Sequence, residues 1–307
     1  MVLVSSKYLL DRAYQEHFAI GAFNAGNSEF VKNIITVAEN LQSPVIIQIY
    51  PLEYELMGSK IIKYVLEAAK VSNVPIAVHL DHGRDLNDVL RSNKDQLNSV
   101  MIDTSAEEFA KNVAATSEVV DICHRLGIAV EAELGSIGNR FANDSSNMGR
   151  IYTDPNSAKE FIEQTQVDFL AVSIGTVHGP YPSGKNEIRI DILKEINRAL
   201  KIPLVLHGGS KNPDQKIKEA IENGIAKVNI STDIKLPYFH AIKDTVIEKP
   251  TDYEPWIMLK QANQIQKDIL KEKILLFGSN GKASEYLNDF RHLKPYFPYE
   301  GEKVEFY

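Results

Sequence analysis

Short apolar runs alternate with longer amphipathic stretches along the whole chain. Each run is rich in β-branched residues and almost continuously apolar, which is typical of parallel strands covered on both faces. The stretches between them, such as residues 28–42 and 108–127, have helical periodicity. The pattern predicts eight strands, at residues 20–25, 44–50, 75–82, 99–105, 128–135, 169–175, 203–209 and 226–232.

The repetition of strand and helix indicates the fold class. Eight such units in 307 residues predict an α/β protein with a closed (β/α)8 TIM barrel. The competing fold, an open doubly wound sheet, needs a glycine-rich phosphate-binding fingerprint after its first strand, and residues 23–30 (FNAGNSEF) do not provide one. No Ser/Gly-rich linker divides the chain. We therefore expect one domain over residues 1–307, with extra helices at 255–275 and 282–291 in a C-terminal extension of about 250–307.

Charge and cysteine content narrow the possible partners and location. The formal net charge is −7, so we expect no nucleic-acid or membrane partner, although a locally positive site for an anionic small molecule is compatible with it. The single cysteine, Cys123, allows no disulfide within the chain and indicates a reducing cytoplasm. The N-terminal segment lacks the pattern of a secretory signal, and no run approaches the ~18 apolar residues of a membrane span.

Histidine side chains gather at the expected ends of the strands. Residues 79–83 (HLDHG) end the third strand, His178 follows the sixth, and His207 ends the seventh. Three neutral imidazoles with one open coordination position form a typical catalytic zinc site. Because the carboxyl ends of barrel strands meet at one rim, we predict that His82, His178 and His207 bind a metal ion there. His79 is expected to pack inside the barrel or to support these ligands.

Small and polar residues follow the last two predicted strands. Residues 207–210 (HGGS) and 229–233 (NISTD) lie where barrels usually bind phosphate through backbone amides and hydroxyl groups. Gly179 offers another close approach of the backbone. Two long polar segments, residues 136–154 and 176–190, follow the fifth and sixth strands, and loops of this length are often functional lids. The sequence thus predicts a polar rim suited to an anionic ligand.

Several of these motifs together resemble those of the class II fructose- and tagatose-bisphosphate aldolases. The resemblance covers most of the chain, and its most specific part is the combination of HLDHG, GTVHG and LHGGS. The matching motifs are GAFNAGN (21–27), HLDHG (79–83), SVMID (99–103), VEAELGSIG (130–138), AVSIGTVHG (171–179), LVLHGGS (204–210), KVNISTD (227–233) and LFGSNGKA (276–283).

The resemblance implies a role for each matching residue. The zinc ligands of the family match His82, His178 and His207. The positions that hold the metal in a second, displaced location match Asp103 and Glu133. The site for the dihydroxyacetone phosphate half of the substrate matches Gly179, Gly208, Gly209, Ser210, Asn229, Ile230, Ser231 and Thr232. The glycines of this site also imply a bound monovalent cation, Na⁺ or K⁺.

The implied activity is that of a metal-dependent aldolase, a carbon–carbon lyase of carbohydrate metabolism such as glycolysis. It reversibly cleaves a ketose (bis)phosphate into dihydroxyacetone phosphate and an aldehyde such as glyceraldehyde 3-phosphate. In this chemistry Zn²⁺ stabilises the enediolate, and Asp81 matches the acid that exchanges a proton with the aldehyde-end oxygen. The resemblance also implies a homodimer or a homotetramer.

The loop after the fifth strand departs from the family pattern. The proton-abstracting base of the family lies in an acidic cluster there, whereas residues 138–147 read GNRFANDSSN. Asp144 is the carboxylate that could take this role, with an unexpected cation at Arg140 in the same loop. Three alternatives follow: an ordinary aldolase, a divergent aldolase for a different acidic or deoxy sugar phosphate, and a non-catalytic zinc- and phosphate-binding protein. Ser231 leaves the choice between fructose and tagatose open.

Overall fold

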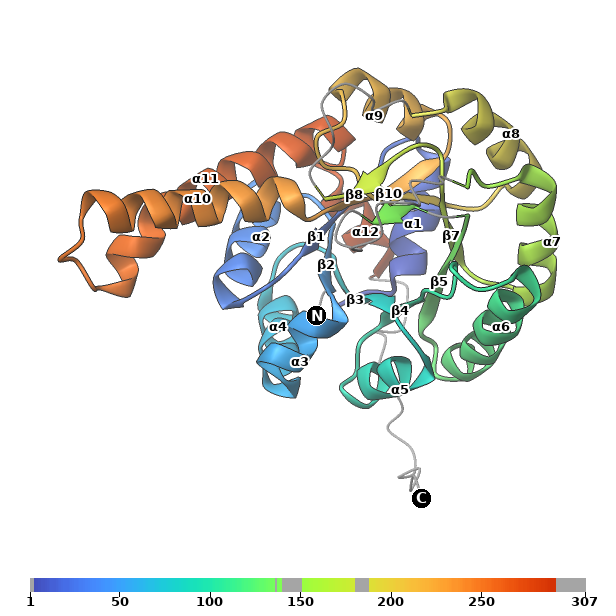
Figure 1. The fold of residues 1–307 in the computed structure, drawn as a ribbon, viewed down its shortest axis with the longest axis horizontal. Coiled ribbons are helices and arrows are strands. Elements are labelled where there is room, and N and C mark those ends of the chain that lie inside the picture. Colours follow the sequence, from blue (N-terminus) through green and yellow to red (C-terminus); the bar gives the residue numbers. More distant parts are fainter. Residues whose placement is uncertain (1–2, 136, 140–150, 180–187, 291–307) are drawn as a thin grey trace.

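A parallel barrel forms the centre of the computed structural model, which describes residues 3–135, 137–139, 151–179 and 188–290 (Figure 1). The strands close in the order β1, β2, β3, β4, β5, β7, β9, β10, with β10 pairing with β1. All eight lie within one residue of a predicted run, which confirms the (β/α)8 fold and excludes the open sheet. Their bounds are Ile20–Asn24, Val45–Ile49, Ile76–Gly83, Ser99–Ile102, Ala129–Leu134, Phe169–Val172, Leu204–Leu206 and Ile225–Ile230.

Helices surround the barrel and cover its outer face (Figure 1). Side-chain caps define where several of them begin, because a cap satisfies a backbone N–H that has no partner within the helix. Asn27 accepts from the Phe30 amide, Asp85 from Asp88, and Asp154 from Ser157. The surrounding helices are α2 (Ser28–Asn40), α3 (Pro51–Met57), α4 (Ser59–Val71), α5 (Leu86–Lys94), α6 (Phe109–Arg125), α7 (Pro155–Thr165), α8 (Ile190–Leu200) and α9 (Asp214–Glu222).

Two further helices, α1 (Ser6–Gln15) and α12 (Ala283–Phe290), lie at the N-terminal end of the strands. The Val4 amide donates to the carbonyl of Ile76, the first residue of β3, at 2.9 Å. Leu9 and Leu10 are fully buried there, and the hydroxyl of Tyr286 donates to the Leu9 carbonyl at 2.8 Å. Apolar side chains therefore close the N-terminal end of the barrel, which we call the floor. The opposite end, where the carboxyl ends of the strands lie, is the mouth.

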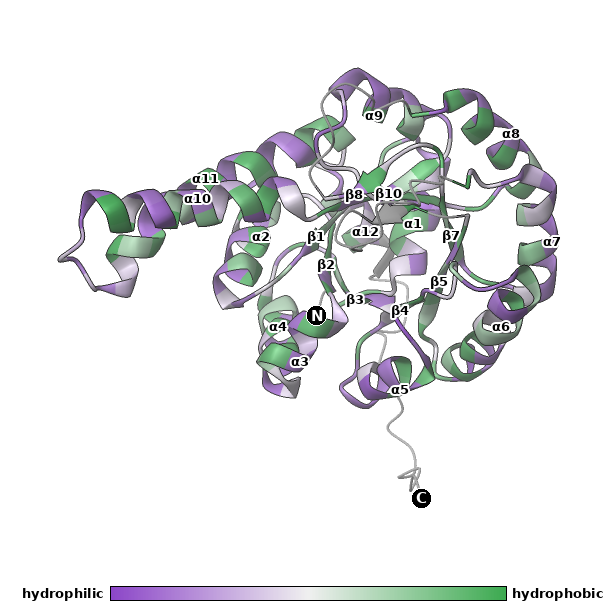
Figure 2. Ribbon diagram, viewed as in Figure 1, coloured by the Kyte–Doolittle hydropathy of each residue, from purple (hydrophilic) through white to green (hydrophobic). Residues whose placement is uncertain are grey.

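The last two long helices, α10 (Thr232–Glu248) and α11 (Pro255–Phe277), run side by side and project beyond the barrel (Figure 1). Their ribbons carry apolar residues along much of their length (Figure 2), and Phe239, Ile247 and Trp256 are exposed. Helices α11 and α12 match the extra helices expected at 255–275 and 282–291. Within the described part of the chain, we find no helix that combines the length and apolar character needed to span a bilayer.

A two-residue pair of parallel strands, β6 (Gly138–Asn139) and β8 (Val177–His178), was not predicted. The sequence indicated a polar loop over residues 176–190, but Val177 and His178 pair in register with Gly138 and Asn139. Two residues carry too little hydrophobic pattern to be recognised as a strand. The pairing matters because it anchors the backbone of His178.

Candidate active site

The carboxyl ends of the barrel strands surround a cavity of about 720 Å³. Strand β3 ends in Asp81 and His82, and β5 carries Glu133. His178 reaches the cavity from β8, and residues just after β4, β9 and β10 complete its wall. This is the end of the barrel at which such folds place their chemistry. The predicted polar rim is therefore present as a concave site.

Three imidazoles meet in this cavity, as predicted. His82, His178 and His207 each offer a ligand nitrogen, and these nitrogens all lie within 4.8 Å of one another. The Nε2 of His82 is 3.0 Å from the Nδ1 of His207, and the ring centroids of His82 and His178 are 5.0 Å apart. His82 adopts a left-handed backbone conformation, with φ 52°, which is costly for a non-glycine residue. The end of β3 thus turns its imidazole towards the other two.

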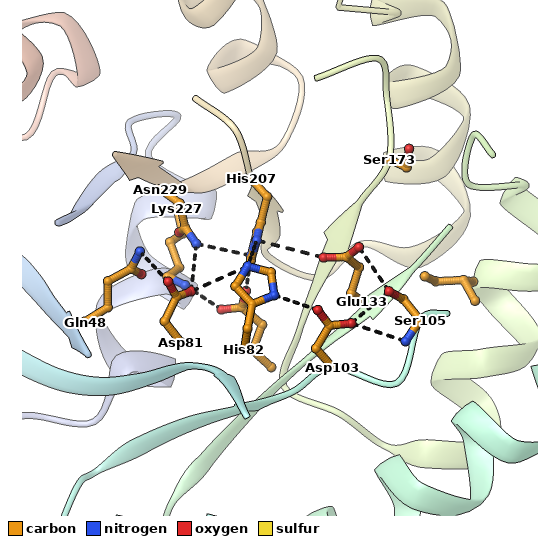
Figure 3. Close-up of polar contacts among 12 residues, drawn as sticks. Gln48, Asp81, His82, Asp103, Ser105, Glu133, Ser173, His207, Lys227 and Asn229 are labelled. Atoms are coloured by element: carbon orange, nitrogen blue, oxygen red, sulfur yellow. Dashed lines mark hydrogen bonds and ion pairs between the residues drawn. The ribbon is translucent and has the colours of Figure 1, made fainter. Parts of the chain in front are cut away.

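Carboxylates flank the imidazoles on one side (Figure 3). The Nδ1 of His82 donates to Asp103 at 2.6 Å, which leaves Nε2 free to act as a ligand atom. Ser105 donates to Asp103 at 2.8 Å and faces Glu133 at 3.2 Å. A ligand atom of His82 lies within 4.8 Å of carboxylate oxygens of Asp103 and Glu133, so these three residues form a second group with metal-binding geometry.

A buried carboxylate oxygen tests whether these residues fit a divalent metal. The Oε2 of Glu133 is buried and has no hydrogen-bond partner among the described residues. The Nδ1 of His207 lies 3.9 Å from this oxygen, beyond hydrogen-bond distance. A buried carboxylate is costly unless it is paired or coordinates a metal. This oxygen and the three imidazoles therefore fit a cation, and nitrogen and oxygen ligands of this kind suit zinc.

Burial and the neighbouring charges separate the proton affinities of these groups in the metal-free protein. Burial, followed by the charge of Asp103, raises the pKa of Glu133 to about 8. Burial, followed by the charge of His82, lowers the pKa of His178 to about 4. Burial opposes protonation of His82, but Asp81 and Asp103 outweigh it and raise the pKa to about 10. The site therefore holds neutral and charged imidazoles side by side, which is a frequent property of functional sites.

Asp81 lies on the other side of the imidazoles (Figure 3). Three amides orient it, of which Gln48 and Asn229 are labelled in the figure. Asn24 donates to its Oδ2 at 2.7 Å and Gln48 at 3.3 Å, while Asn229 donates to its Oδ1 at 3.3 Å. Burial alone would raise the pKa of Asp81, but the charges of His82 and His207 and the Asn24 hydrogen bond lower it. Asp81 is thus a carboxylate in a fixed orientation. Asn24 and Gln48 were not among the predicted site residues. Their only signal in the sequence is that each is a polar residue in an otherwise apolar strand.

The residues predicted to bind phosphate lie on the same cavity wall. Gly179, Gly208, Ser210, Asn229, Ser231 and Thr232 all line the cavity. Gly209 and Ile230 do not line it: the Gly209 amide donates to the Asn229 carbonyl at 3.2 Å, and the Ile230 side chain is buried in the hydrophobic core. Arg84 and Lys235 also line the cavity, where Arg84 pairs with Glu55 and Asp88 and Lys235 pairs with Glu53.

Asp144, the candidate base, and Arg140 lie outside the described residues. By contrast, the structure adds a buried polar pair that the sequence analysis did not recognise. Lys227 and Glu131 are both fully buried inside the barrel, and Glu131 contacts the Nε2 of His207 at 2.7 Å. A charged residue within an apolar strand was the only signal for Lys227.

Comparison with known proteins agrees with this geometry. The family model described as "Fructose-bisphosphate aldolase class-II" matches residues 4–282. The "Probable fructose-bisphosphate aldolase" of Bacillus subtilis is 37% identical over 92% of this chain and all of the relative. The "D-tagatose-1,6-bisphosphate aldolase subunit GatY" of Klebsiella oxytoca is also 37% identical, again over 92% of this chain and all of the relative. The "Sulfofructosephosphate aldolase" of Alkalicoccus urumqiensis is 36% identical over 93% of this chain and all of the relative.

A solved structure gives the same result. The YdjI aldolase from Escherichia coli K12 superposes with a TM-score of 0.80 and 35% sequence identity, over 92% of this chain and 99% of the other. Family, relatives and fold agree over nearly the whole length of the chain. The chain therefore belongs to the class II fructose-bisphosphate aldolase family, whose members are carbon–carbon lyases and generally depend on zinc.

Proposed function

We propose that this protein is a zinc-dependent aldolase that reversibly cleaves a ketose (bis)phosphate into dihydroxyacetone phosphate and an aldehyde such as glyceraldehyde 3-phosphate. One observation supports it above all others. Three imidazoles from distant parts of the chain converge beside the Asp81 carboxylate in a cavity at the mouth of the barrel. A protein that only binds a metal would not need a carboxylate fixed by three amides at this place.

We assign His82, His178 and His207 as the zinc ligands, with Asp103 and Glu133 near enough to hold the ion in a second location. Zinc supplies a Lewis acid, which stabilises the negative charge that develops next to the ketone carbonyl when the carbon–carbon bond breaks. Asp81 accepts the proton of the hydroxyl group that becomes the aldehyde, and returns it in the condensation direction. Its three amide donors, two on Oδ2 and one on Oδ1, hold the carboxylate in position for this transfer.

The anionic half of the substrate is assigned to the wall formed by Gly179, Gly208, Ser210, Asn229, Ser231 and Thr232, while Gly209 and Ile230, which do not line the cavity, support the backbone of this wall. Backbone amides and hydroxyl groups at the ends of the last two barrel strands suit a phosphate group. A monovalent cation, Na⁺ or K⁺, at the glycine turns also belongs to this proposal. Asp144 remains our candidate for the base that removes a proton from dihydroxyacetone phosphate.

The identity of the ketose is the open part of the proposal. The relatives named above act, by their names, on fructose bisphosphate, tagatose bisphosphate and sulfofructose phosphate, which are all anionic at both ends. Arg84 and Lys235 at the cavity wall suit such substrates if they exchange their present ion pairs, with Glu55 and Asp88 and with Glu53, for contacts to the substrate. A divergent acidic or deoxy sugar phosphate is the alternative, motivated by the missing acidic cluster in residues 138–147. We also propose a homodimer or homotetramer and a cytoplasmic location, the latter because of the single, buried Cys123.

Turnover assays with these ketoses test the function. We expect purified, zinc-loaded protein to release triose phosphate from at least one of fructose bisphosphate, tagatose bisphosphate and sulfofructose phosphate. A chelator should abolish the release, and added zinc should restore it. Tight zinc binding without turnover of any of these ketose phosphates would instead support the non-catalytic zinc- and phosphate-binding protein.

A further inference from the structure

A fully buried lysine lies inside the barrel, below the cavity. Lys227 belongs to β10, and its side chain has no exposed surface. Its Nζ is 2.7 Å from the Oε2 of Glu131 on β5 and 3.4 Å from the Nε2 of His79 on β3. A lysine is almost never fully buried unless it is paired, because leaving water is costly for an ammonium group. This placement therefore needs an explanation beyond packing.

Glu131 connects this lysine to an imidazole at the mouth of the barrel. One carboxylate oxygen, Oε2, contacts Lys227, while the other, Oε1, is 2.7 Å from the Nε2 of His207. Both side chains of this second contact are fully buried. A carboxylate that contacts an ammonium group accepts through both oxygens, so the Nε2 of His207 carries the proton and donates it. The amide nitrogen of Asn229 is also 3.2 Å from this Nε2, but it donates to Asp81. Lys227, Glu131 and His207 thus form a continuous chain of polar contacts.

The direction of this hydrogen bond determines which nitrogen of His207 faces the mouth. With its proton on Nε2, neutral His207 has a lone pair on Nδ1. That Nδ1 lies 3.0 Å from the Nε2 of His82, at the point where the imidazoles meet. A carboxylate that accepts from the remote nitrogen of a ligating histidine fixes both the tautomer and the orientation of the ring.

We propose that Lys227 is a positioning residue that acts through Glu131 to orient His207 for zinc binding. The inference rests on the proposed function, because it takes His207 to be a zinc ligand. Lys227 holds Oε2 of Glu131, so Oε1 stays directed at the Nε2–H of His207. His79 supports the lysine from the other side: it accepts from Lys227 and donates from Nδ1 to Ser99 at 2.6 Å.

The same chain of contacts continues to the floor of the barrel. The hydroxyl of Ser6, in α1, donates to the hydroxyl of Ser99 at 2.6 Å. Ser6, Ser99 and His79 are all fully buried. The polar contacts therefore extend from His207 to the helix that closes the opposite end of the barrel. A simpler reading is that the Lys227–Glu131 pair only stabilises the fold, so the test must separate folding from zinc binding.

A double-mutant cycle makes this separation. Lys227→Met removes the ammonium group and keeps a side chain of similar length. Glu131→Gln keeps an oxygen that can accept from His207 and removes the charge that Lys227 holds. The readout is the zinc affinity of the folded protein, measured by competition with a chelator of known affinity. Circular dichroism and thermal unfolding of the metal-free variants report separately on folding.

We expect Lys227→Met to weaken zinc binding by about 10- to 100-fold, the usual effect of losing an outer partner of a metal ligand. In the Glu131→Gln background the same substitution should have no further effect, because the residue through which Lys227 acts has already lost its charge. Additive effects of the two substitutions, or unchanged zinc affinity in folded Lys227→Met, would overturn the inference. If Lys227→Met alone does not fold, the zinc affinity of folded Glu131→Gln decides, because an affinity equal to that of the wild type would overturn the inference.

Lys273 provides a matched control. It is another largely buried lysine, 10% exposed, and its Nζ is 3.1 Å from a carboxylate oxygen of Asp233. It belongs to α11 and not to the barrel interior. Lys273→Met should lower stability but leave zinc affinity at the wild-type value. A loss as large as that of Lys227→Met would show that any buried lysine has this effect, and would overturn the inference.

The proposed function and the inference fail in different ways. A wild-type protein that binds zinc without cleaving any ketose phosphate refutes the function, while the affinity cycle still tests the positioning role. Conversely, an active wild-type enzyme with additive substitutions refutes the positioning role alone. A wild-type protein that takes up no zinc contradicts both.

Discussion

The two ends of the barrel are built from the same strands but have opposite chemistry. At the floor, α1 and α12 bring Leu9, Leu10 and Tyr286 against the barrel, and these side chains are fully buried. At the mouth, Asp81, Glu133 and His207 are equally buried, each less than 5% exposed, but they are polar. The floor is stabilised by removing apolar surface from water, whereas the mouth depends on hydrogen bonds and on charges of opposite sign.

This difference shows how one fold separates stability from activity. Apolar packing at the floor has no directional requirement, so many side chains of similar volume could replace those present. Each polar side chain at the mouth must instead meet a partner at hydrogen-bond distance. Substitutions at the floor should therefore change stability and leave chemistry intact, and substitutions at the mouth should do the reverse. Three predictions test this, in order of decreasing effect.

Asp81→Ala should produce the largest effect at the mouth. We expect kcat to fall by about 10²- to 10⁴-fold, the range for losing a general acid–base group, while zinc stays bound because the three imidazoles remain. Kinetics on the substrate found active, together with metal analysis, measure the two effects. Asp121, exposed on α6, is the matched control. Normal kcat in Asp81→Ala would show that another group transfers the proton.

Leu10→Ala should act only at the floor. The side chain has no exposed surface, so we expect its truncation to lower the free energy of unfolding by about 2–5 kcal/mol. Chemical denaturation measures this loss, and kcat should not change at temperatures where the variant is folded. Leu56→Ala, at a side chain that is 83% exposed, provides the control and should be neutral. A large fall in kcat for folded Leu10→Ala would show that the two ends are not independent.

Gly208→Ala, at the mouth, should have a smaller effect, and it should lower both the stability and kcat. Gly208 has φ 62°, and an added Cβ would lie 2.8 Å from the carbonyl carbon of Val177, next to His178. We expect a loss of about 1–3 kcal/mol in unfolding free energy and a reduced kcat, because Val177 must shift. Gly281→Ala separates the two causes, since Gly281 has φ 77° but no atom within 4 Å of its Cβ. Equal effects in both variants would mean that backbone conformation alone is responsible.

Several features could be predicted because they follow from local pattern. The eight strands are nearly continuous apolar runs, and each begins and ends within a few residues of its predicted bounds. The meeting of the three histidines could be predicted because the carboxyl ends of all barrel strands lie at one rim. Asn24, Gln48 and Glu131 were not assigned roles, because each depends on distant partners. Asp81 is 57 residues from Asn24 and 33 from Gln48, and Glu131 is 76 residues from His207 and 96 from Lys227.

The sequence alone determined the barrel, the rim on which its chemistry lies, and the types of ligand collected there. These follow from hydrophobic periodicity and from the residues at strand ends, which are properties of short segments. Only the tertiary structure decided which polar groups meet inside the barrel: the contact of Lys227 with Glu131, the contact of Glu131 with His207, and the amides around Asp81. The reason is geometric, because the closure of the barrel brings side chains of β3, β5, β9 and β10 together across its interior. The local sequence of a strand does not specify which side chains it will meet there.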